Sequence, residues 1–163
     1  MAIEMISWLV AIPLLGFATG LRTMTPIAIL CWWAYHGDMS VDGTWASWTA
    51  KLITPIVFTV LALGELIGDK LPQTPNRIAP FPLAARLVFG GLCGALSAIA
   101  LSGPGMEGII LGVIGAIIGA FVGFMLRREL VAHFQCADWK IALPEDILTI
   151  TVALFAAHII AIS

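Results

Sequence analysis

Charged residues are scarce in this sequence. Lys and Arg number 8 and Asp and Glu number 10 among 163 residues, so 11% of the chain is charged, against about 25% in soluble domains. Apolar residues make up 60%, and the mean hydropathy is +1.02. A surface with so little charge would not keep the chain dispersed in water. The composition therefore predicts an integral membrane protein, with residues 1–163 forming one domain and the lipid bilayer as its surroundings.

Several functional signatures are also missing. No basic block or stripe is present, which argues against nucleic-acid binding. Cys31, Cys93 and Cys136 lie far apart without CxxC or Cys/His spacing, so we expect no disulfide, metal site or cofactor. The sequence lacks a nucleophile elbow, a P-loop and an HExxH motif, which disfavours the familiar enzyme classes without excluding every enzyme.

Long apolar runs are abundant instead. A helix that crosses the hydrocarbon core needs about 20 apolar residues, and 49–68, 83–101, 108–126 and 147–162 provide them. The first apolar region, 5–35, would be roughly 46 Å long as one helix, and the polar GLRTMTP with Pro26 interrupts it. We therefore expect an all-α protein with about five transmembrane helices, the first broken or re-entrant near GLRTMTP.

The distribution of Lys and Arg predicts an orientation. The loops 69–82 and 127–146 contain Lys and Arg, whereas 36–48 and 102–107 contain neither. By the positive-inside rule the N-terminus and the basic loops would be cytoplasmic and the C-terminus outside. Residues 15–70 and 85–128 also share a faint pattern, and one interpretation is a weak inverted repeat of the kind found in transporters.

Charged residues inside these runs are candidate functional groups. Glu65 lies roughly 21 Å along the helix that begins near Lys51, within the inner third of the hydrocarbon, and Asp69 follows one turn later. An intramembrane carboxylate suggests cation binding or proton relay; the alternative is a buried ion pair that fixes helix register. Arg22 in the helix break suggests an anion site; alternatively, it lies at the outer interface or pairs with a carboxylate such as Glu65. The residues of this predicted ion or substrate pathway are Arg22, Thr23, Thr25, Glu65, Asp69 and Lys70.

Two further groups of residues stand out. A cytoplasmic cationic patch would bind a lipid headgroup or a phosphate, although the same charges also serve simply as topology signals. Its predicted members are Arg77, Arg86, Arg127 and Arg128. Glycines at small-xxx-small spacing indicate close helix packing, in the manner of a glycine zipper. The predicted packing positions are Gly64, Gly68, Gly112, Gly115, Gly119 and Gly123.

Four motifs together resemble a family of bacterial membrane proteins. They are GLRTMTP, GELIGDKLPQTPNR, PLAARLVFGGLCGAL and the glycine-rich run that ends in RREL. Across about 14–155 the chain resembles domain-of-unknown-function family 4126. The resemblance implies a multi-pass protein of the bacterial inner membrane, and it implies no substrate and no catalytic residue.

Three functions remain open from the sequence. The first is a small transporter or channel-like permease for an ion or small anionic solute, with possible proton coupling, acting as a homo-oligomer and most simply a dimer. The second is a protein that binds or processes a phospholipid or polyprenyl phosphate at the cationic patch. The third is an assembly partner without a substrate, in which the glycines matter and the buried charges only set register.

Overall fold

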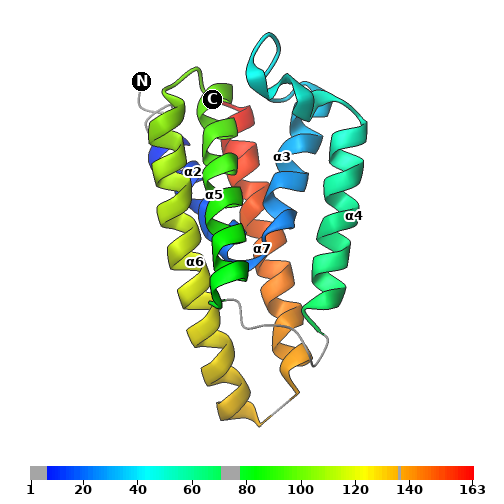
Figure 1. The fold of residues 1–163 in the computed structure, drawn as a ribbon, viewed down its shortest axis with the longest axis vertical. Coiled ribbons are helices and arrows are strands. Elements are labelled where there is room, and N and C mark those ends of the chain that lie inside the picture. Colours follow the sequence, from blue (N-terminus) through cyan, green and yellow to red (C-terminus); the bar gives the residue numbers. More distant parts are fainter. Residues whose placement is uncertain (1–6, 71–77, 136) are drawn as a thin grey trace.

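The computed structural model describes residues 7–70, 78–135 and 137–163, and every regular element in these ranges is a helix (Figure 1). The predicted all-α class is confirmed for this part of the chain. The elements are the π-helix η1 (Ser7–Ala11), α2 (Ile12–Leu21), α3 (Met24–His36), the 3-10 helix η2 (Trp45–Ala50), α4 (Ile53–Gly68), α5 (Pro80–Ala100), α6 (Gly105–Phe134) and α7 (Asp138–Ala161).

Three helices within the described ranges are long and apolar enough to cross a bilayer, which is consistent with a membrane protein. They are Pro80–Ala100, Gly105–Phe134 and Trp139–Ala161. α4 has 16 residues and is about 24 Å long, somewhat shorter than the roughly 30 Å of hydrocarbon. α7 begins at Asp138, well before the predicted start at 147, and therefore includes acidic residues that the sequence assigned to a loop.

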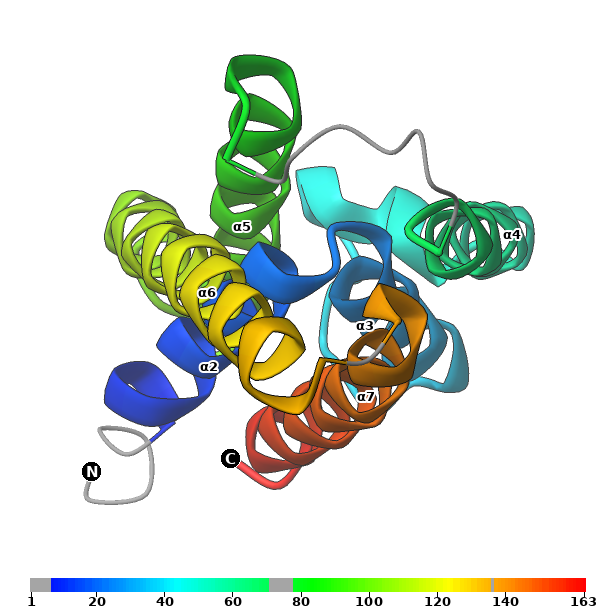
Figure 2. The same cartoon turned by 90° about the horizontal axis from the view of Figure 1, so that it is seen from below.

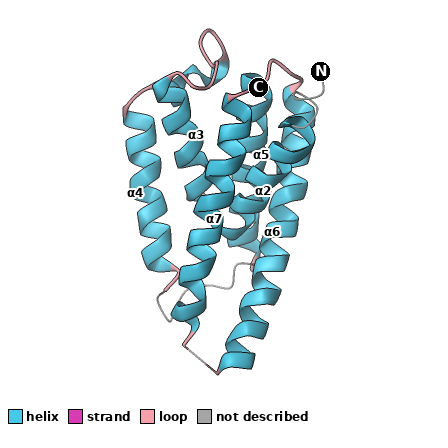
Figure 3. Ribbon diagram, turned by 180° about the vertical axis from the view of Figure 1, so that it is seen from behind, coloured by secondary structure: helices cyan, strands magenta, loops and turns pink. Residues whose placement is uncertain are grey.

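The break in the first apolar region lies within GLRTMTP, as predicted. α2 ends at Leu21, Arg22 is extended with φ −138° and ψ 116°, and α3 begins at Met24. Pro26 lies in the first turn of α3, where its missing N–H needs no partner. In Figures 1 and 3, α2 runs from one end of the molecule to about mid-height and α3 returns to the same end, so the two helices form a V.

The V changes the expected relation between the two ends of the chain. η1 lies at the same end of the molecule as the end of α7. The C-terminal ends of α4 and α6 lie toward the opposite end (Figure 1). The sequence placed the N-terminus on the side of Lys70 and Arg127, because it counted the first region as one crossing. In the described residues the chain turns back instead, so the start of α2 and the C-terminal end of α4 lie at opposite ends of the molecule (Figure 1).

α6 packs against both α2 and α5 through backbone contacts. A Cβ on Gly112 would collide with the carbonyl of Gly90, and one on Gly115 or Gly119 would collide with carbonyls of α2. Gly112, Gly115 and Gly119 therefore lie where α6 comes closest to α5 and α2, and Gly123 is buried on the same helix.

The same role is not found for the glycines of α4. Among the described residues nothing lies within 4 Å of a Cβ built on Gly64 or Gly68, so no helix of the described chain packs there. Glycine spacing shows where a helix can come close and does not show that one does, so the packing role of Gly64 and Gly68 stays a prediction.

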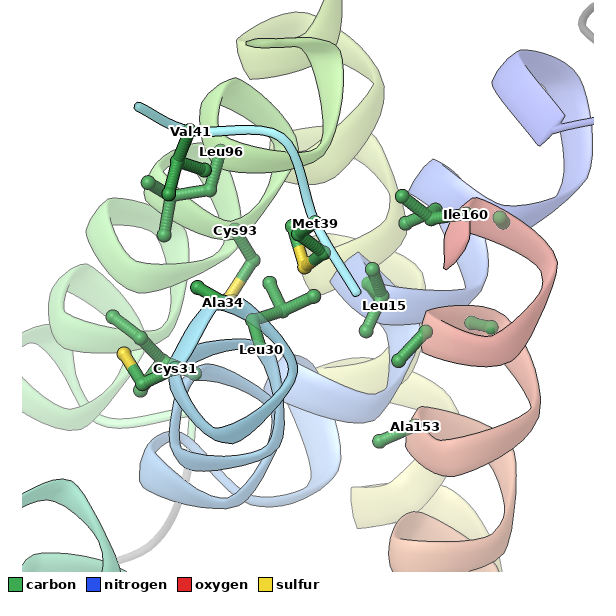
Figure 4. Packing of buried hydrophobic residues seen from close by; sticks show 14 of the residues in the cluster. Leu15, Leu30, Cys31, Ala34, Met39, Val41, Cys93, Leu96, Ala153 and Ile160 are labelled. Atoms are coloured by element: carbon green, nitrogen blue, oxygen red, sulfur yellow. The ribbon is translucent and has the colours of Figure 1, made fainter. Parts of the chain in front are cut away.

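The apolar core lies between α2, α3, α5 and α7. Leu15, Leu30, Cys31 and Cys93 are fully or almost fully buried there (Figure 4). Met39, from the loop after α3, covers the same cluster (Figure 4). α4 is peripheral: it packs mainly on α3 and η2, stands at the edge of the bundle in Figure 2, and buries only Pro55 and Ala62.

The faint inverted repeat has no counterpart in the order of the elements. α2 and α3 are separated by a break, whereas α5, α6 and α7 are each continuous over their described lengths. The pattern that suggested the repeat, an arginine followed by two apolar helices and a charged end, therefore covers a V and α4 in residues 15–70 but two continuous helices in residues 85–128.

Candidate functional site

The side chain of Arg22 lies wholly inside the protein at the tip of the V. Its Nε donates a hydrogen bond of 2.6 Å to Oδ1 of Asp146 on α7. Its Nη1 lies 2.8 Å from Oδ2 of Asp69, the residue after α4, and its Nη2 lies 3.9 Å from Oε2 of Glu145. These two contacts are ion pairs without hydrogen-bond geometry, because neither Nη atom has a hydrogen-bond partner. One guanidinium thus holds carboxylates from two helices far apart in the sequence.

Two more cations surround these carboxylates. Lys70 Nζ lies 2.7 Å from Oδ2 of Asp146 and donates to the carbonyl of Leu66 at 2.8 Å. Arg127 on α6 forms an ion pair with Asp69, and its Nη1 lies 3.6 Å from Oε2 of Glu145. We call these six residues, three cations and three anions, the charge network: Arg22, Lys70, Arg127, Asp69, Glu145 and Asp146.

The charge network links the V to α4, α6 and α7 without a net formal charge. Burying ions is costly, and mutual attraction repays that cost only when every charge has a partner. Asp146 shows how closely the charges are shared, because one of its oxygens faces Arg22 and the other faces Lys70. Movement of any of these helices would therefore require the ions to exchange partners.

Glu65 lies beside the network and has a different partner. Its Oε1 accepts a hydrogen bond from the amide of Thr23, and its Oε2 accepts one from the amide of Met24, each at 2.7 Å. These amides open the first turn of α3, where N–H groups have no partner within the helix. The negative charge also faces the positive end of the helix dipole. Glu65 therefore caps α3 from the neighbouring α4.

Arg86 on α5 caps the other side of the break. Its Nε donates a hydrogen bond of 3.0 Å to the carbonyl of Gly20, in the last turn of α2, and its Nη1 donates to the carbonyl of Pro82 at 3.1 Å. A cation at a helix C-terminus and an anion at a helix N-terminus both complement the dipoles. The broken backbone is thereby stabilised at its two helix ends by side chains of opposite charge.

The structure brings together the six residues of the predicted pathway. Arg22, Asp69 and Lys70 belong to the charge network, and Glu65 binds the amide of Thr23. The alternative that Arg22 pairs with a carboxylate is confirmed, but its partners are Asp69, Glu145 and Asp146 and not Glu65. In this conformation Glu65 accepts hydrogen bonds from the first amides of α3. Thr25 is buried, and its hydroxyl has no hydrogen-bond partner.

Sequence reasoning missed Glu145 and Asp146. Both were assigned to a loop because the last apolar run was taken to begin at 147. In the structure they lie within α7, in its second and third turns. The signal was present in PED, where two adjacent acids follow Pro144 at the edge of an apolar segment. Their partner is Arg22, 124 positions away from Asp146, and no local pattern identifies such a pairing.

The predicted cationic patch does not form from its described members. Arg86 is buried against Gly20, and Arg127 is part of the charge network. Arg128 is exposed, with its guanidinium carbon 5.6 Å from the centre of the Phe124 ring. Arg77 lies outside the described residues. The sequence placed Arg86 and Arg127 on a surface. In the structure Arg86 binds the C-terminal end of α2, and Arg127 pairs with Asp69 inside the bundle.

An apolar pocket of about 190 Å³ lies between α2, α6 and α7. Phe17, Leu21 and Leu126 contribute to its walls, and Arg127 and Glu145 line it as the charged members. The charge network therefore borders a partly open space lined mainly by apolar side chains. Over the described ranges no group of three or more His, Cys, Asp and Glu residues could hold a metal ion. The cation that lies among the three carboxylates of the network is the guanidinium of Arg22.

No family model, curated protein or solved structure matches this chain. Membership of domain-of-unknown-function family 4126 consequently stays a prediction from the four motifs.

Proposed function

We propose that this protein is a small permease of the bacterial cytoplasmic membrane, of transporter or channel-like type, that moves an ion or a small anionic solute. One observation carries the proposal: Arg22 is completely buried at the break between two half-helices and is bound by carboxylates of α4 and α7. Charges at membrane depth are costly and are usually functional. Transporter sites recur where helices are discontinuous at mid-membrane.

The proposed topology has four crossings, α4 to α7, and a re-entrant V made of α2 and α3. This revises the five crossings expected from the sequence. Lys70, Arg127, Arg128 and Lys140 belong to the cytoplasmic side under the positive-inside rule. Because the V returns to the end from which it starts (Figure 1), both described ends of the chain are then on the outer side. A homodimer of this small bundle is part of the proposal.

In this proposal the charge network is the inner gate. Its three cations and three anions leave no net charge, so partners can be exchanged without leaving an uncompensated ion in the bundle. A solute ion that enters the network would replace one member of a pair. Protonation of a carboxylate would have a related effect, because it removes one anion and frees its cation, and this is how proton coupling would arise.

The two alternative functions have less support. The lipid-phosphate hypothesis depended on a shared cationic surface, yet Arg86 and Arg127 are occupied inside the bundle. The assembly hypothesis makes the charges purely structural. It predicts that a folded variant with a disrupted network behaves like the wild type in every functional assay.

The proposal is tested with purified protein in proteoliposomes. Gradients of sodium, potassium, chloride, formate, acetate and phosphate are applied one at a time, and both membrane currents and the internal pH are recorded. We expect at least one gradient to give a response in wild type and in the exposed control Arg128→Gln, and a strongly reduced response in folded Arg22→Gln. Wild-type responses equal to those of protein-free liposomes for all six solutes would overturn the proposal.

A further inference from the structure

The carboxylate of Glu65 is held in the way that a ligand is held. Each of its two oxygens accepts one backbone N–H, from Thr23 and Met24, and both distances are 2.7 Å. The donors belong to the V, whereas Glu65 belongs to α4. Two adjacent amides at a helix N-terminus form a ready-made anion site, and the one-oxygen-per-amide arrangement matches a planar carboxylate better than a single-atom ion.

A second observation also indicates a ligand at this turn. The Thr25 residue is only 6% exposed, and its hydroxyl Oγ1 has no hydrogen-bond partner. Side chains on an α-helix lean toward its N-terminus, so this hydroxyl belongs to the same first turn of α3. A buried hydroxyl without a partner is unfavourable, and a ligand with a further acceptor oxygen or a bound water would satisfy it.

The element that supplies Glu65 is the one least embedded in the bundle. α4 buries only Pro55 and Ala62 along its length and packs mainly on α3 and η2. A Cβ on Gly64, beside Glu65, would meet nothing within 4 Å among the described residues. The inner end of α4 is therefore connected to the other helices chiefly by polar groups, namely Glu65, Asp69 and Lys70.

We propose that the first turn of α3 is a binding site for small carboxylate solutes, and that Glu65 occupies it as a tethered competitor. When the C-terminal end of α4 moves away, the amides of Thr23 and Met24 lose their hydrogen-bond partner. The hydroxyl of Thr25 already lacks one, and no water is available in the membrane to replace them. A solute carboxylate restores those hydrogen bonds. This inference names the substrate class of the proposed permease and depends on that function for its physiological role, although the site itself does not.

The charges around the turn are compatible with an anion. Arg22 directly precedes the two amides, and Arg86 lies on the α2 side of the break. Asp69, one turn after Glu65, is already paired with Arg22 and Arg127. A solute carboxylate that replaces Glu65 exchanges one negative charge for another, so the charge balance of the region does not change.

The test is rescue of stability by formate in detergent-purified variants. Glu65→Ala removes the tethered carboxylate and leaves its space empty, so its thermal midpoint should be lower than that of wild type and should rise saturably with formate. Chloride at the same ionic strength should raise it less, because one atom cannot face both amides as two oxygens do. Glu129→Ala is the matched control, because Glu129 is an exposed glutamate of α6 outside the network. The thermal midpoints of wild type and of Glu129→Ala should rise only slightly with formate, and by the same amount.

Glu65→Gln provides a second variant that keeps the shape of the side chain and one acceptor oxygen. Its midpoint should also rise with formate, less steeply than that of Glu65→Ala and more steeply than that of wild type. Formate responses in both Glu65 variants that are no larger than those of Glu129→Ala would overturn the inference. Because this assay measures binding in detergent, rescue without any solute flux in liposomes would leave the site standing and remove the permease function instead.

Discussion

Replacement of Arg22 by glutamine is the most informative stability experiment. Arg22 is the one fully buried cation of the charge network, with contacts to Asp146 at 2.6 Å and to Asp69 at 2.8 Å. Without it, the described cations of the network that face its three carboxylates are Lys70 and Arg127. We therefore expect the change to destabilise the protein by leaving one buried negative charge uncompensated.

The contacts set the expected magnitude. Removal of one partner of a buried ion pair typically costs about 3–5 kcal/mol. Asp69 retains Arg127, and Asp146 retains Lys70, whose side chain is 26% exposed and can be hydrated. The loss should therefore lie near the lower limit, at about 3 kcal/mol. Arg128→Gln, at an exposed position of α6, should change the free energy of unfolding by less than about 0.5 kcal/mol.

The assay is equilibrium unfolding in detergent micelles followed by tryptophan fluorescence. Asp146→Asn and the double variant complete a mutant cycle with Arg22→Gln. The double variant loses one cation and one anion, so it restores the charge balance and should be more stable than the sum of the single changes predicts, by about 1–2 kcal/mol. A loss for Arg22→Gln equal to that for Arg128→Gln, or single changes that add within about 0.5 kcal/mol, would refute the account of the charge network.

Three further predictions concern the packing, the helix ends and the sidedness. Gly112→Ala should destabilise the protein by about 1–3 kcal/mol, because the new Cβ meets backbone of α5. Gly64→Ala, with open space around it, should be neutral or stabilising by up to about 1 kcal/mol. Equal effects of the two changes in unfolding measurements would contradict the packing. Arg86→Gln should lower stability by about 1–3 kcal/mol by weakening the cap on α2, and an unchanged thermal midpoint would contradict that role. In a background without native cysteines, Ser163→Cys and Lys140→Cys should react with an impermeant maleimide from opposite sides of intact cells or inverted vesicles, and labelling of both from one side would exclude the proposed topology.

Local chemistry explains which parts of the fold were predictable. The helical class follows from the apolar runs, because a backbone in lipid must satisfy its own hydrogen bonds. The break within GLRTMTP follows from proline and polar residues in a short stretch. The direction of α3 after the break does not follow from them, because it depends on how α2 packs against the glycines of α6 and on how Glu65 and Arg86 cap the two helix ends.

Only some residues of the candidate site could be predicted from the sequence. Arg22, Glu65 and Asp69 are conspicuous because each interrupts an apolar segment. Asp146 is as central to the site as Arg22, yet it stands at the edge of an apolar segment, where a charge is ordinary. Arg86 and Arg127 served in the sequence as topology signals, but a count of charges does not show whether a side chain faces water or a neighbouring helix end.

Counterflow in proteoliposomes tests the central claim most directly. Vesicles that contain wild-type protein are loaded with unlabelled formate and diluted into a trace of labelled formate. If the protein is a permease for small carboxylates controlled by the charge network, wild type and Arg128→Gln should accumulate label transiently, and folded Arg22→Gln should not. Label uptake by wild type that is indistinguishable from that of protein-free vesicles would contradict the account.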